Sequence, residues 1–142
     1  MPSGNDNLST AVNTAKERDL KPLLEESAEA LELDLRQVVE METGLNEAWF
    51  FGIKTGYKVM VETKMGQSDP TPVILSMQDE FQEVMERCAE ALNLTLGATI
   101  TAFNFLGQAW IAGTKFWEVE IAARLIEHEL GGFDEVLREL EG

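Results

Sequence analysis

The chain has 142 residues, of which 26 are acidic and 11 basic, so its formal net charge is −15. This charge argues against nucleic acid and anionic membranes as direct partners, because both would be repelled. The single cysteine, Cys88, excludes an internal disulfide and fits a reducing compartment, so we expect a cytoplasmic protein of one domain.

The start of the chain predicts a flexible N-terminus over residues 1–8, followed by a single helical domain over residues 9–142. Ser9 is a candidate N-cap for a short first helix that ends near Leu20. Pro22 then suits the first turn of the next helix, where the missing N–H costs nothing.

A break between helices is predicted at Asp34, because Gln37 follows three residues later, as in a capping box. After a short helical turn, a long helix is predicted over residues 45–65, whose apolar side chains follow the spacing i, i+3, i+4, i+7. Gly52 and Gly56 lie on its apolar side. Because glycine costs about 1 kcal/mol relative to alanine inside a helix, we expect another helix to approach closely there.

The second half of the chain begins after a linker at residues 66–72, which contains glycine, serine and two prolines. Ser76 is expected to cap a helix over residues 77–92, and Thr95 then takes the place that Asp34 has in the first half. The remaining predicted elements are a long helix from Thr101 or Phe105 to Leu130, a C-terminal cap at Gly131 and Gly132, and a short helix over residues 133–140.

An internal repeat is the clearest pattern in the sequence. A shift of 61 positions places residues 25–54 on residues 86–115 with 12 identities in 30 positions, including Trp49 with Trp110 and Gly52 with Gly113. Two unrelated segments of average composition would share about two identities in 30 positions. We therefore expect an all-α fold: a bundle of about six helices, formed by two tandem copies of a helix–break–long-helix unit around a pseudo-two-fold axis. Copy one covers about residues 20–65 and copy two about residues 76–130.

The two copies differ in polarity, because residues 91–114 of copy two contain no charged side chain. Asparagine, glutamine and threonine interrupt this stretch, so it is too polar for a membrane-spanning helix. We expect it to form the more buried half of the bundle. The alternative is that it presents an apolar surface to a partner.

The sequence contains few residues that suggest catalysis or metal binding. His128 is the only histidine, and the sequence contains no nucleophile elbow, phosphate-binding loop, zinc-ligand spacing or calcium loop. No catalytic residue and no cofactor are therefore expected in the leading interpretation. An alternative is a hydrolase of phosphorylated small molecules that uses Mg²⁺ or Mn²⁺, if repeat-related glutamates one helical turn apart converge. The metal-binding residues of this alternative are Glu25, Glu29, Glu86 and Glu90.

The leading functional interpretation is a non-enzymatic, acidic protein–protein interaction module, acting as an inhibitor, adaptor, assembly factor or structural subunit. Its partner would be another protein, for which a basic surface suits the charge, and a homo-oligomer is also allowed. Another alternative is an acidic mimic of nucleic acid that blocks a basic groove. The candidate partner-binding residues, besides the exposed acids of copy one, are the aromatic side chains Phe103, Phe105, Trp110, Phe116 and Trp117.

Overall fold

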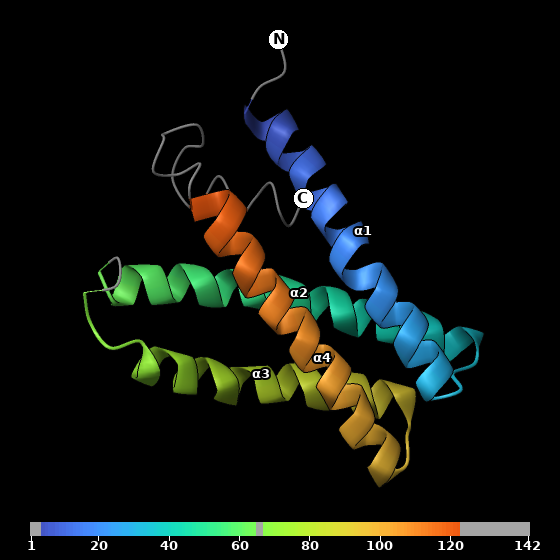
Figure 1. Ribbon diagram of the computed structural model, residues 1–142. Helices are drawn as coiled ribbons and strands as arrows, with labels where there is room; N and C mark the ends of the chain where they lie inside the picture. Colours follow the sequence, from blue (N-terminus) through green and yellow to red (C-terminus); the bar gives the residue numbers. More distant parts are fainter. Residues whose placement is uncertain (1–3, 65–66, 123–142) are drawn as a thin grey trace.

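The computed structural model describes residues 4–64 and 67–122, and all regular structure in these residues is helical (Figure 1). The elements are α1 (Gly4–Ala30), α2 (Leu35–Glu62), α3 (Thr71–Leu92), α4 (Leu96–Phe116) and a π-helical turn, η1 (Trp117–Ile121). The predicted all-α helical bundle is confirmed, with four α-helices in the described residues where about six were expected for the whole chain. Within the same residues, no helix combines the length and apolarity that crossing a membrane requires.

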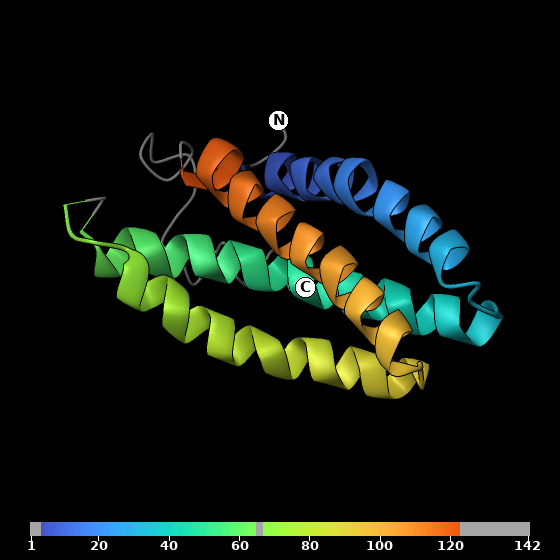
Figure 2. The ribbon, with the colours of Figure 1, turned by 60° about the horizontal axis from the view of Figure 1, so that its bottom comes forward.

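The bundle is built around the crossing of α2 and α4. These two helices run in the same general direction and cross at Gly52 of α2 and Gly113 of α4, while α1 and α3 lie on opposite sides of the pair (Figures 1 and 2). Each helix turns an apolar stripe inward, and together the stripes form one core. Met41, Leu45, Ala48 and Trp49 supply this stripe on α2, and Ala102, Leu106 and Ala109 supply it on α4.

Glycines allow the backbones of α2 and α4 to touch. A Cβ atom at Gly52 would collide with the carbonyl oxygen of Trp110, and one at Gly113 would collide with the carbonyl oxygen of Trp49. The hydroxyl of Thr114 donates a hydrogen bond to the Gly52 carbonyl at 3.1 Å. Gly56 likewise faces Trp117. The predicted close approach at Gly52 and Gly56 is therefore confirmed, and it explains why glycine is used despite its low helix propensity.

The starts of α2 and α4 follow the caps that the sequence predicts. Asp34 accepts a hydrogen bond from the Gln37 backbone at 2.8 Å, and the Gln37 side chain accepts one from the Asp34 backbone at 3.0 Å. Thr95 accepts a bond from the Ala98 backbone at 3.3 Å. Glu32 and Asn93 have positive φ angles of 51° and 52°, a conformation that stops the preceding helix in each case.

Side chains at the start of α2 donate hydrogen bonds to backbone carbonyls at the end of α3. The guanidinium of Arg36 donates to the Ala91 carbonyl at 3.1 Å, and the Gln37 amide donates to the Leu92 carbonyl at 2.9 Å. The last carbonyls of a helix have no partner inside the helix, so these side chains satisfy groups that would otherwise depend on water. The contacts fix the end of α3 beside the start of α2.

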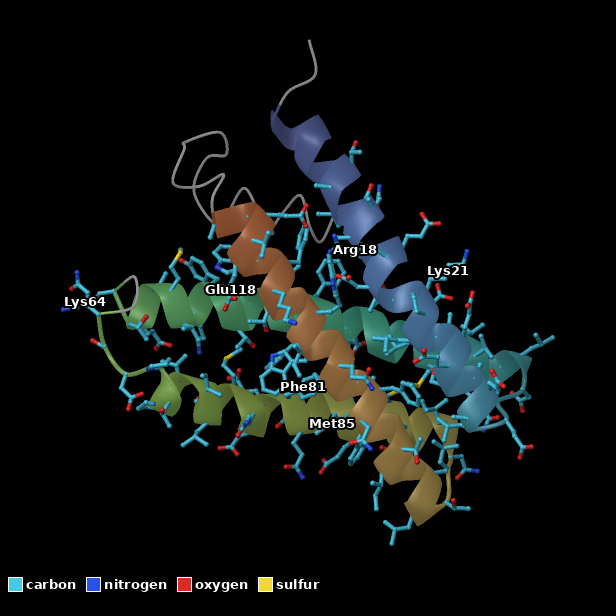
Figure 3. The ribbon with its side chains drawn as sticks, in the orientation of Figure 1. Arg18, Lys21, Lys64, Phe81, Met85 and Glu118 are labelled. Carbon is cyan, nitrogen blue, oxygen red and sulfur yellow. The ribbon has the colours of Figure 1, made fainter. Side chains whose placement is uncertain are left out.

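Aromatic side chains fill the centre of the bundle. Trp49 packs against Phe116 at 5.0 Å between ring centroids, and its indole N–H donates to Asp19 on α1 at 3.3 Å. Trp110 packs against Phe81 at 4.5 Å, and its indole N–H donates to the Thr55 hydroxyl at 2.9 Å. Figure 3 shows Phe81 lying between α3 and α4. The two tryptophans therefore tie α1 to α2 and α4 to both α2 and α3.

Several predicted boundaries in the first half are wrong. Residues 4–8, expected to be flexible, belong to α1, and Ser9 lies inside this helix instead of capping it. α1 also continues through Pro22 where two helices were expected. Leu20, Leu23 and other buried residues on both sides of Pro22 form a single stripe against the core. This burial offsets the local cost of proline, which is about 3 kcal/mol in a helix interior.

The long helices also begin earlier than predicted. The expected short turn and long helix of copy one are merged in α2, which starts at Leu35, and α4 starts at Leu96 in the same way. α3 begins at Thr71, so Ser76 lies inside it and the linker is shorter than residues 66–72. Other predictions fall outside the described residues: His128, the end of the long helix at Leu130, the Gly131–Gly132 cap and the helix over residues 133–140.

Candidate interaction surface

The four glutamates of the predicted metal site do not form a shared site. Glu25 and Glu29 are exposed on α1, and Glu86 and Glu90 are exposed on α3. These two helices lie on opposite sides of the α2–α4 pair (Figure 2). Within residues 4–64 and 67–122, no group of three or more histidine, cysteine, aspartate or glutamate side chains is placed to hold a metal ion. The geometry therefore gives the Mg²⁺- or Mn²⁺-dependent hydrolase no metal centre in this part of the chain.

Of the five candidate aromatic residues, two are buried in the core and three are half-buried. Phe116 and Trp117 are only 2% and 1% exposed, so their prediction as partner-binding residues is wrong for the folded chain. Trp117 packs edge-on against Tyr57 at 5.6 Å. Phe103, Phe105 and Trp110 are half-buried and pack against the core. Only these three keep an uncovered part for a partner.

The outer face of α4 carries an exposed apolar surface. Leu96 is 80% exposed, and Ile100 and Ile111 are each 57% exposed. Together with Phe103 and Gly107 they follow the spacing i, i+4, i+7, i+11 and i+15, which places them on one side of the helix. We call these five residues the α4 stripe. Copy two, expected to be the more buried half of the bundle, therefore has an exposed apolar face on α4, because this helix is apolar on two sides.

A groove lies beside the second half of the α4 stripe. It has a volume of about 700 Å³ and runs between α4, the last turns of α2 and the start of α3. Trp110 and Ile111 line its α4 side, and Val59 and Ile74 line the other sides. Glu118, labelled in Figure 3, stands at its edge on η1. The groove is thus an apolar continuation of the α4 stripe into the body of the bundle.

Exposed apolar residues recur at matched places in the two halves. Leu35 and Val39 are exposed in the first turns of α2, as Leu96 and Ile100 are in the first turns of α4. Each residue is 61 positions from its counterpart.

The acidic side chains cover a different surface. Asp79, Glu83, Glu86 and Glu90 are exposed and follow one another along the outer side of α3, with spacings of four, three and four residues. This row is the part of the surface on which mimicry of nucleic acid would depend. No observation tests that hypothesis, and it stays a prediction. The carboxylates of α3 do not overlap the α4 stripe, whereas Lys115 and Glu118 line the groove beside it.

Cys88, the only cysteine of the chain, lies inside the core and is not activated. Its side chain is buried, and it lies directly against Gly44, where α2 passes α3. Burial raises the pKa of the Cys88 thiol to about 11, and the carboxylates of Glu47 and Glu40 add to this effect. A thiol becomes a nucleophile only as the thiolate, so Cys88 is a packing residue at neutral pH.

This pKa predicts how stability depends on alkaline pH. In the unfolded chain the thiol loses its proton near its ordinary pKa of 9.0, whereas in the folded chain it does so near 11. The contribution of Cys88 to the free energy of unfolding is therefore complete below pH 9 and is lost as pH rises through 11. Urea unfolding at several pH values should show a steeper fall in this window for the wild-type chain than for Cys88→Ala. Equal slopes for the two proteins would contradict the assignment.

Comparison of the chain with protein-family models, with curated protein sequences and with solved structures finds no match.

Proposed function

We propose that this protein is a non-enzymatic, acidic interaction module that binds another protein chain through the outer face of α4. The observation that carries this proposal is the α4 stripe. Large apolar side chains that are more than half exposed lie in one row, on a chain whose net charge is −15. Extended exposed apolar patches on water-soluble domains are most often interaction sites, because leaving them in water is unfavourable.

The position of the stripe on α4 also favours contact with a partner over packing within the same chain. From Leu96 to Thr114 the helix has no charged side chain on any side. Its inner side, with Leu106, Ala109 and Gly113, already contacts α2. The outer side repeats the apolar pattern without a contact among the described residues that would bury Leu96, Ile100 or Ile111. A partner that covers these side chains would gain roughly 25 cal/mol for each Å² of apolar surface removed from water.

The duplication is part of the same proposal. We infer that the domain consists of two copies of one helical hairpin, related by a pseudo-two-fold axis through the α2–α4 crossing. The support is a constant shift of 61 positions between matched features. These pairs are the N-caps Asp34 and Thr95, the left-handed residues Glu32 and Asn93, the crossing glycines Gly52 and Gly113, and the exposed residues Leu35 and Leu96. The cytoplasm remains the expected location, where Cys88 would stay a free thiol.

The test is site-specific crosslinking in the cells that make the protein. A photoreactive amino acid is placed at Ile100 or at Ile111, and at Gln82 on the outer side of α3 as a matched exposed control. We expect a discrete protein–protein adduct from both α4 positions and none from Gln82. The mass of the adduct identifies the partner. No adduct from α4, or equal labelling from all three positions, would overturn the proposal.

A further inference from the structure

We draw no further inference here: the strongest candidate, the apolar groove of about 700 Å³ between α4, the last turns of α2 and the start of α3, continues the surface already described, and nothing in residues 4–64 and 67–122 shows what covers it.

Discussion

Replacement of Gly113 by alanine is expected to lower the free energy of unfolding by about 3 kcal/mol, the upper part of the range for overpacked cores. The added methyl group would overlap the backbone carbonyl of Trp49, and a backbone has no alternative rotamer through which to avoid the collision. α2 and α4 would have to separate at their crossing, and the packing of the tryptophans on both helices would loosen. Urea unfolding followed by far-UV circular dichroism measures the change.

The matched control is Gly97→Ala on the same helix. A Cβ atom at Gly97 meets no described atom within 4 Å, so alanine should raise the free energy of unfolding by up to about 1 kcal/mol through its better helix propensity. The same substitution is thus expected to have opposite signs at two positions of α4. If Gly113→Ala were as mild as Gly97→Ala, the backbone contact between α2 and α4 would not exist in solution.

Replacement of Trp117 by alanine is expected to lower the free energy of unfolding by about 3–5 kcal/mol, the range for deletion of a buried large aromatic side chain. Trp117 is 1% exposed and fills the space between Gly56 and Tyr57, so its removal would leave a cavity that two helices line. The melting temperature should fall by many degrees, because such a loss is a large fraction of the stability of a domain of this size. Thermal unfolding measures the effect.

Phe103→Ala separates this core role from an interface role. Phe103 is half-buried on the α4 stripe, so its loss should cost less stability than that of Trp117 but should weaken binding at the α4 surface. Crosslinking from Ile111 in the folded variant reads out the binding effect. A Trp117→Ala protein with normal stability and lost binding would instead return Trp117 to the interface, as the aromatic pattern of the sequence suggests.

The sequence by itself determined the helical class of the described residues and the local points where helices start. The 3.6-residue spacing of apolar side chains, the capping box of Asp34 with Gln37, and the threonine cap at Thr95 depend on residues within one turn of each other, so they can be read from the chain. The close approach at Gly52 can also be predicted from the sequence. Glycine destabilises a helix, so its presence on the apolar side of one predicts that another helix approaches closely there.

The tertiary structure decided which faces are covered. Pro22 predicts a break by its local cost, yet α1 continues through it because buried residues on both sides hold the helix against the core. Phe116 and Trp117 could have faced a partner until the α2–α4 crossing placed them inside. Whether Glu29 and Glu90 converge depends on the positions of α1 and α3 around that crossing, and within residues 4–64 and 67–122 no such cluster is placed to hold a metal ion. The uncovered side of Ile100 and Ile111 has the same origin: α4 is apolar on two sides, and only the packing of the bundle decides which of them is buried.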